Sequence, residues 1–300
     1  MGKNGKKTQA GKPKKLTPKN IGKRLDALVK KLEEELKGAD IFVPLPPTED
    51  CAICLVPLSR LLSETCYHAC CGNEICKACA IEHDESIEKQ NEKKNSGKKL
   101  AFTCPFCREL IPTSYGQESM RQLQSRCLLN DHHALYLVGH KHLVGGNGVP
   151  KDDLKSLDYF IRAVELGSPQ ACVHIGNRRA EGNGMAVNKE RVALFQRVGA
   201  LRGSLAARHN IGRIEYHTLT FGNHEIGIRH WKIAAEAGHQ KSLHALRDIY
   251  NAGGSRPGKE FISKDYLDSA YRACHEAQME VKTEEREKHR TTAESSKSKC

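Results

Sequence analysis

The first strong hydrophobic pattern in the chain is the segment IGKRLDALVKKLEEELK. Its apolar residues recur at helical spacing, with charged residues between them: Ile21, Leu25, Leu28, Val29, Leu32 and Leu36. This pattern predicts one amphipathic helix over residues 20–37, and the apolar face of such a helix has to be covered. We expect it to pack on the chain's own domain, and docking on a partner helix is the alternative.

The next segment, residues 38–50, interrupts this pattern. Gly38 ends the helix, and three prolines fall within four positions, at Pro44, Pro46 and Pro47. The residue before a proline is disfavoured in the helical conformation, so helices end ahead of such segments. The segment is therefore predicted to be an extended linker.

The second half of the chain repeats itself. Two series of glycines recur at spacings of 35 to 37 residues: Gly139, Gly176 and Gly212, and Gly167, Gly203 and Gly238. GNG also recurs, at 146–148 and 182–184. Each unit can be written as two helices, and such hairpins bury their apolar faces only by stacking, which predicts an all-α solenoid over residues 117–272. A phosphate-binding loop is the alternative for the GNG segments, but neither a GK[ST] motif nor a strand accompanies them.

These units resemble Sel1-like repeats, relatives of the tetratricopeptide array. The match is carried by ALYLVGHKHLVGGNGVPKDDLKSLDYFIRAVELGSPQ and ARHNIGRIEYHTLTFGNHEIGIRHWKIAAEAGHQKS, and it covers roughly residues 132–272. The third unit departs from the pattern through a shortened loop, FGNHEIG, and the fourth is degenerate. The resemblance implies a concave surface that holds a protein substrate or a complex partner.

Cysteines are concentrated between these two helical regions. Nine of the thirteen fall between Cys51 and Cys107, and six of them form CxxC pairs: Cys51 and Cys54, Cys76 and Cys79, and Cys104 and Cys107. The two thiolates of such a pair can ligate one tetrahedral zinc ion, so each pair supplies half of a site. Two zinc ions need eight ligands, and the remaining two must come from CYHACC, which offers Cys66, His68, Cys70 and Cys71.

The segments CAIC, CCGNEICKAC and CPFCR, within residues 51–108, resemble a RING finger. The resemblance implies a cross-brace, in which the first and third ligand pairs share one zinc ion and the second and fourth share the other. Site one is then Cys51, Cys54, Cys76 and Cys79, and site two is Cys70, Cys71, Cys104 and Cys107. A frequent RING form has histidine where this chain has Asn73, a poor zinc ligand. Adjacent cysteines are expected to ligate instead, with Gly72 easing the sharp turn, and Cys66 or His68 in place of Cys70 is the alternative.

The two predicted zinc ions are structural. A module of this size is too small to fold around an apolar core alone, and four thiolates leave no coordination position for a reactive water. The fold class is therefore a small zinc-stapled cross-brace (RING-like) module followed by an all-α solenoid of Sel1-like helical hairpins.

RING fingers commonly act as ubiquitin ligases that hold a ubiquitin-charged E2 enzyme in a reactive pose, without a covalent intermediate. The residues that match the E2 contacts of the family are Ile53, Pro105 and Arg108, and Arg108 matches the basic position that bridges E2 and ubiquitin. No catalytic residue is expected in the chain itself. The alternative is a non-enzymatic scaffold in which the zinc module is one more interaction surface.

The charge and hydropathy of the chain limit the classes of partner and the cellular location that we expect. The formal charge is +12, but residues 1–19 hold seven lysines and no acid, which is typical of a disordered tail, and residues 273–300 form a second charged tail. Nucleic acid is not expected as a partner, because aromatic residues make up only 5% of the chain and no base-reading motif occurs. Neither a secretory signal nor a long apolar run is present, which favours a cytoplasmic or nuclear protein without a membrane contact.

Overall fold

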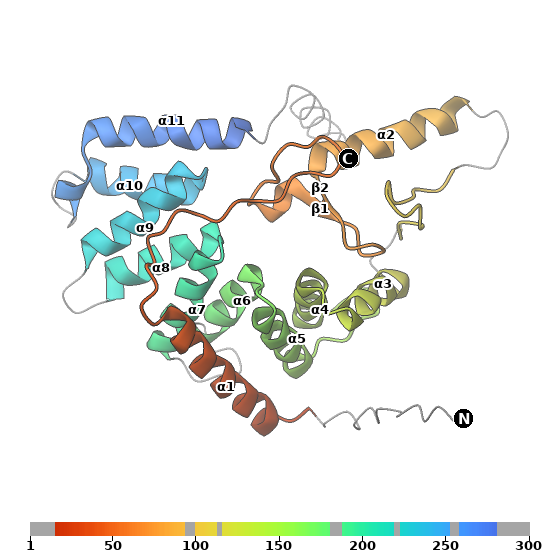
Figure 1. Cartoon of the computed structure of the whole chain (residues 1–300), viewed down its shortest axis with the longest axis horizontal. Coiled ribbons are helices and arrows are strands. Elements are labelled where there is room, and N and C mark those ends of the chain that lie inside the picture. Colours follow the sequence, from red (N-terminus) through yellow and green to blue (C-terminus); the bar gives the residue numbers. More distant parts are fainter. Residues whose placement is uncertain are drawn as a thin grey trace, which may run out of the picture.

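The computed structural model describes residues 16–93, 100–112, 116–180, 188–218, 223–252 and 258–280. Its elements, drawn in Figure 1, are α1 Pro18–Leu36, η1 Leu62–Glu64, β1 Thr65–Tyr67, β2 Glu74–Cys76, α2 Lys77–Lys93, α3 Gln117–Leu128, α4 His132–Val144, α5 Asp153–Glu165, α6 Pro169–Ala180, α7 Lys189–Leu201, α8 Leu205–Thr218, α9 His224–Glu236, α10 Gln240–Asn251, η2 Lys259–Phe261 and α11 Lys264–Glu280. Most of the lysine-rich tail, the second GNG segment and residues 281–300 lie outside the described residues.

The helices from α4 to α11 form antiparallel hairpins, α4–α5, α6–α7, α8–α9 and α10–α11, which stack into a curved array with α3 packed on α4 (Figure 1). This is the solenoid that the glycine repeats predict. The sequence predicts a charged tail from residue 273, but helix α11 continues to Glu280. The reason is that Cys274 is buried in the core of the last hairpins and continues the apolar face of the helix.

The two glycine series have different roles. Gly139 and Gly212 lie inside helices, and a Cβ atom there would stand 2.9 Å from the ring of Phe160 and 2.7 Å from the ring of Trp231. Gly167 follows α5 with a φ of +99°, a left-handed conformation that favours glycine at a helix end. The period in the sequence therefore marks close helix contacts in one series and helix ends in the other.

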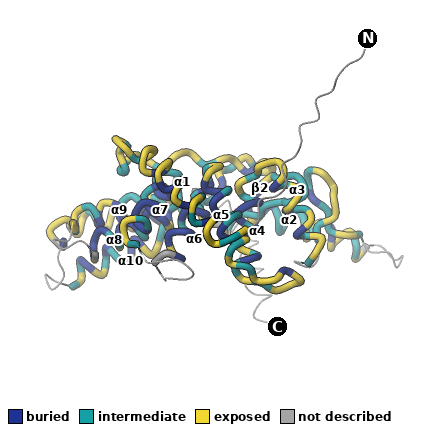
Figure 2. The backbone as a smooth tube through the Cα atoms, turned by 90° about the horizontal axis from the view of Figure 1, so that it is seen from below, coloured by how far each residue is buried: buried dark blue, intermediate teal, exposed yellow. Residues whose placement is uncertain are grey.

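The amphipathic helix α1 packs on α5 and α7, the second helices of the first two hairpins. Its apolar residues join the main core, where Leu32, Phe160 and Phe195 are fully buried. Figure 2 shows buried positions on α1, α5 and α7 where these helices meet. An ion pair between Asp26 and Arg191, 2.7 Å apart, joins α1 to α7 at the edge of this contact. Packing on the chain's own domain is confirmed.

The cysteine-rich segment lies on the inner side of the curved array, opposite α1 (Figure 1). It is built from the antiparallel pair β1 and β2, in which Thr65 faces Cys76, and from α2. Because β1 and β2 are only three residues long each, this small sheet cannot be stable without further support. The support comes from the cysteine groups on one side and from the array on the other.

The β1–β2 hairpin contacts the array at Asp131, which caps the N-terminus of α4. Oδ2 of Asp131 accepts hydrogen bonds from Tyr67 Oη at 2.7 Å and from Arg126 Nη2 at 2.9 Å. The Tyr67 ring stacks on His133, with ring centroids 4.4 Å apart. Burial alone would raise the pKa of Asp131, but the donors from Tyr67 and Arg126 hold it below its usual value. We call these four residues the Asp131 joint.

Candidate metal centre

Two similar backbone loops present the first and last cysteine pairs. In the first loop Leu55 N–H donates to Cys51 O at 2.8 Å, and in the second Arg108 N–H donates to Cys104 O at 3.0 Å. The residue after each pair has a positive φ, 58° for Leu55 and 61° for Arg108. This conformation is uncommon outside glycine, so both loops are held by their surroundings in a shape that turns both cysteines of a pair toward one point.

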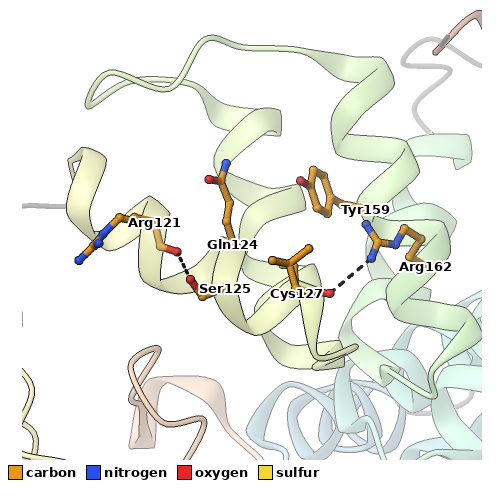
Figure 3. Close-up of a pocket in the computed structure, with 7 residues that line it drawn as sticks. Arg121, Gln124, Ser125, Cys127, Tyr159 and Arg162 are labelled. Carbon is orange, nitrogen blue, oxygen red and sulfur yellow. Dashed lines mark hydrogen bonds between the residues drawn. The ribbon is translucent and has the colours of Figure 1, made fainter. Parts of the chain in front are cut away.

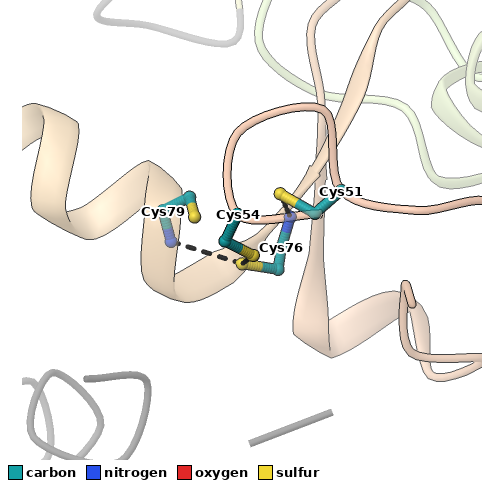
Figure 4. Close-up of side chains that lie close together, drawn as sticks. All are labelled: Cys51, Cys54, Cys76 and Cys79. Carbon is teal, nitrogen blue, oxygen red and sulfur yellow. Dashed lines mark hydrogen bonds between the residues drawn. The ribbon is translucent and has the colours of Figure 1, made fainter. Parts of the chain in front are cut away.

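The first thiol group consists of Cys51, Cys54, Cys76 and Cys79, whose sulfur atoms all lie within 4.8 Å of one another (Figure 4). The first two come from the first loop, Cys76 ends β2, and Cys79 lies in the first turn of α2. The Sγ atoms of Cys54 and Cys76 are 3.9 Å apart. Residues more than twenty positions apart in the sequence therefore converge on one small volume.

Backbone amides stabilise negative charge in this first group. Burial alone would raise the pKa of Cys51, but amide donors from Cys54, Cys76 and Ile53 lower it to about 6. Burial and the neighbouring thiols raise the pKa of Cys79. A thiolate is thus favoured at Cys51 in the absence of a cation, and a divalent cation would favour deprotonation of Cys79.

The second thiol group consists of Cys70, Cys71, Cys104 and Cys107, again with all sulfur atoms within 4.8 Å. The Sγ atoms of Cys71 and Cys104 are 3.7 Å apart. A tight turn lets two adjacent cysteines point the same way: Gly72 has a φ of +84°, and its N–H donates to His68 O at 2.7 Å. Gly72 also leaves room for the array, because a Cβ atom there would stand 2.2 Å from the Arg126 guanidinium.

Cys66 and His68, the alternatives to Cys70, lie outside both thiol groups. Cys66 is in β1, opposite Ile75, and packs against the core beside the first group. The His68 ring stands edge-on to Phe106, with ring centroids 6.2 Å apart. Both residues therefore contribute packing in this structure.

Asn73 has a role that sequence reasoning missed. Its Nδ2 donates a hydrogen bond to Cys71 Sγ at 3.4 Å, and its backbone oxygen accepts one from His68 N–H at 2.9 Å. A donor to a cysteine sulfur stabilises the thiolate form and orients the side chain. The residue that stands in place of a histidine is thus a support for a candidate ligand. The sequence signal that could have indicated this role was a side-chain amide placed two residues after a cysteine, across a glycine turn.

Both thiol groups fit a tetrahedral zinc ion. With Zn–S bonds of about 2.3 Å, a tetrahedron places its sulfur atoms about 3.8 Å apart; the Cys54–Cys76 pair is 3.9 Å apart and the Cys71–Cys104 pair is 3.7 Å apart. Four sulfur ligands leave no open position for water, so the arrangement suits a structural ion. Along the chain the first pair joins the third and the second joins the fourth, which is the cross-brace order.

No protein-family model matches the chain. Among curated proteins it is similar to ORF96 of Ostreid herpesvirus 1 (isolate France), named as a RING finger protein, with 33% identity over 83 residues. These residues make up 28% of this chain and 32% of that protein, so the match spans about a third of the relative's length.

Two solved structures match part of the chain. A Sel1 repeat protein from Oxalobacter formigenes has a TM-score of 0.41 and 21% identity, over 44% of this chain and 99% of that one. A protective antigen of uropathogenic Escherichia coli strains, which displays an SLR fold, has a TM-score of 0.45 and 21% identity, over 52% of this chain and 33% of that one. The cysteine module has the cross-brace order of a RING finger, and the helical hairpins resemble Sel1-like repeats.

The predicted E2-contact residues lie on the two loops of the RING-like module. Ile53 is 44% exposed in the first loop, and in the second loop Pro105 is half-buried and Arg108 is exposed. Two further apolar residues near them were missed by sequence reasoning: Leu55 is 75% exposed and Leu110 is 57% exposed. For Leu55 the available signal was a large apolar residue directly after a cysteine pair.

An open cavity of about 420 Å³ lies between α3 and α5 of the Sel1-like array (Figure 3). It is lined by Arg121, Gln124, Ser125, Cys127, Leu128, Tyr159 and Arg162. Two of its polar side chains are bound to backbone oxygens, Ser125 Oγ to Arg121 O at 3.0 Å and Arg162 Nη2 to Cys127 O at 3.4 Å. These walls do not bring together a nucleophile and a base. In the described residues no helix combines the length and the apolar character needed to cross a bilayer.

Proposed function

We propose that the chain is a zinc-binding RING protein that recruits a ubiquitin-charged E2 enzyme through the cysteine module and a protein partner through the Sel1-like array. It would then be a ubiquitin ligase or a ligase adaptor. The observation that carries the proposal is the interleaved order of two four-thiol groups, each with sulfur spacing suited to zinc.

Each thiol group would hold one zinc ion, with Cys51, Cys54, Cys76 and Cys79 as the first set and Cys70, Cys71, Cys104 and Cys107 as the second. The ions supply a folding free energy on the order of 10 kcal/mol, which a sheet of two three-residue strands cannot supply. Thiolate ligands persist in a reducing compartment, which favours the cytoplasm or the nucleus.

The E2 surface would be formed by the exposed residues of the two loops. Ile53 and Leu55 offer apolar contact area, and Arg108 offers the planar donors that can bridge two proteins by hydrogen bonds. The chain's part in transfer would be positional: it restrains the thioester of the bound E2 and raises its effective concentration beside the acceptor. No proton needs to move at a side chain of this protein.

The partner surface would be formed by the first helices of the Sel1-like hairpins. Asn177 of α6 accepts from Gln196 Nε2 at 3.1 Å and from Asn210 Nδ2 of α8 at 3.4 Å. Gln196 of α7 is buried and links these two amides. Asn177 and Asn210 form a polar strip between neighbouring hairpins, and amide side chains can bind the backbone of a peptide. Repeat arrays commonly use such curved surfaces to hold other proteins.

The decisive experiment is ubiquitin chain formation with E1, a broad panel of E2 enzymes and the zinc-loaded full chain. We expect chains with the wild type and a loss of roughly tenfold or more with Ile53→Ala or Arg108→Ala, because hot-spot contacts dominate such interfaces. Arg272→Ala is the matched control, since Arg272 is an exposed arginine on α11, the last helix of the array. If no E2 of the panel is stimulated, the non-enzymatic scaffold replaces the ligase proposal.

A further inference from the structure

The linker between α1 and the RING-like module lies against the array instead of spanning a gap. Arg208 of α8 is fully buried, and its Nη1 donates to Ile41 O at 3.0 Å while its Nη2 donates to Ala200 O at 3.2 Å. A buried guanidinium needs hydrogen-bond partners for its donors. Nη1 and Nη2 have them, whereas Nε has none among the described residues. One of the two accepting carbonyls belongs to the linker, 167 residues away in the sequence.

Phe42, the next linker residue, occupies a slot on α9. The guanidinium carbon of Arg229 lies 4.0 Å from the centroid of the Phe42 ring, a cation–π distance. The ring of His230 lies 4.8 Å from the same centroid. His230 is fully buried, and neither of its ring nitrogens has a hydrogen-bond partner among the described residues. It therefore acts as an apolar wall for the phenyl ring.

The backbone of the linker is shaped for this contact. Asp40 Oδ1 accepts a hydrogen bond from Phe42 N–H at 2.9 Å, which is an Asx turn. Farther along, Arg60 Nη2 donates to Pro46 O, and a Cβ atom on Gly203 would stand 3.0 Å from the Pro46 ring. Residues 41–43 form a turn, so the predicted extended form fits only the proline-containing part from residue 44 onward, and the array contacts Ile41, Phe42 and Pro46 of the segment.

We propose that the α8–α9 surface is a binding site for a peptide that turns through an acidic, an aliphatic and an aromatic residue in sequence, and that residues 40–46 of the same chain occupy it. We call it the linker slot, formed by Arg208, Arg229 and His230. Together with the Asp131 joint it fixes the RING-like module relative to the array. Binding of the linker in the slot is independent of zinc binding and of ubiquitin transfer. Only the functional consequence, a RING-like module held in one orientation for a bound E2 enzyme, rests on the proposed function.

Tethering makes this site effective even when its intrinsic affinity is modest. The linker is joined to α1 at one end and to the first cysteine loop at the other, and a short tether produces an effective concentration in the millimolar range. A free peptide with a dissociation constant of about 100 μM would then correspond to roughly 90% occupancy by the chain's own linker. An added peptide binds measurably only when the tethered segment is weakened.

The test uses the full chain with Phe42→Ala and, as a matched control, Val43→Ala, because Val43 is the adjacent and exposed residue of the same linker. The probe is a fluorescent peptide with the sequence of residues 38–47. We expect the Phe42→Ala protein to bind it at least roughly tenfold more tightly than the wild type, and hydrogen exchange in residues 39–46 to rise by roughly tenfold in that variant. The Val43→Ala protein should match the wild type in both measurements.

A second variant checks that the slot is responsible. Adding Arg229→Ala to Phe42→Ala should abolish peptide binding, and Arg229 is exposed, so its loss leaves the core of α9 intact. Fluorescence of Trp231, the single tryptophan, reports whether the array is folded in each variant. If the folded Phe42→Ala protein binds no peptide up to about 1 mM, or if its linker exchanges no faster than that of the wild type, the linker slot is rejected.

Discussion

Replacing Cys70 by serine separates the two thiol groups experimentally. Cys70 belongs to the second group with Cys71, Cys104 and Cys107, whereas Cys66 lies outside both groups and packs in β1. Cys70→Ser should therefore damage one zinc site, and Cys66→Ser, a matched control four residues away, should damage neither. Serine is nearly the same size as cysteine, so the change is in ligand chemistry and not in packing volume.

The expected size of the effect follows from the ligand count. Structural zinc sites with four protein ligands bind with an apparent free energy of about 10–16 kcal/mol. One ligand of four then accounts for about 3 kcal/mol, which is a loss of roughly 100-fold in affinity. The adjacent ligand Cys71 keeps its support from Asn73 at 3.4 Å, so the damaged site is weakened and not erased.

The assay is metal analysis of the full chain after equilibration with a zinc buffer. The buffer sets the free zinc concentration between the dissociation constant of the intact second site and that of the site weakened by Cys70→Ser. We expect about two zinc ions for the wild type and for Cys66→Ser, and about one for Cys70→Ser. Two ions in Cys70→Ser with one in Cys66→Ser would reassign the ligand, and two ions in both would refute the reasoning from sulfur geometry.

Two further predictions concern the array and are read through Trp231 in α9. Burial, and to a lesser extent nearby positive charges, lowers the pKa of His209 and His239 from 6.5 to about 4. The folded state therefore binds fewer protons than the unfolded state below pH 6.5, and the free energy of unfolding should fall by about 1–2 kcal/mol per histidine as the pH drops to 4. Urea denaturation at several pH values measures this loss. Gly212→Ala places a Cβ atom 2.7 Å from Trp231 and should lower the free energy of unfolding by about 1–3 kcal/mol. In the control Gly22→Ala, in α1, the new Cβ atom meets nothing within 4 Å, so the change should be neutral or stabilising. Equal effects of the two substitutions would contradict the packing argument.

Local patterns predict much of this fold, because they depend on contacts that every helix or turn of the same kind must make. The apolar spacing in residues 20–37 predicts α1 and its burial, since a striped helix needs a cover. The glycine period predicts the hairpins, since Gly212 must face a large side chain such as Trp231. The order of cysteine pairs, read through the RING resemblance, predicts which thiols converge.

Contacts between distant segments could not be predicted in this way. Three prolines predict that the linker is not helical, but nothing near them in sequence indicates that Arg208 donates a hydrogen bond to the carbonyl of Ile41. Likewise, nothing in the sequence around Tyr67 indicates that its hydroxyl group donates a hydrogen bond to Asp131. These contacts depend on the curvature of the array, which is the sum of many small packing angles and leaves no periodic signal.

The same distant contacts determine how the two modules can work together. The RING-like module is joined to the array by the continuous chain into α3, by the Asp131 joint at α4 and by the linker on α8 and α9. These attachments are made to different helices of the array. Under the proposed ligase function, a single flexible tether would let a bound E2 enzyme sample a wide volume, whereas this arrangement would confine it to one side of the array. Selectivity for an acceptor lysine would then come from its distance to the array surface, so the Asp131 joint and the linker slot should influence which lysine is modified more than whether transfer occurs.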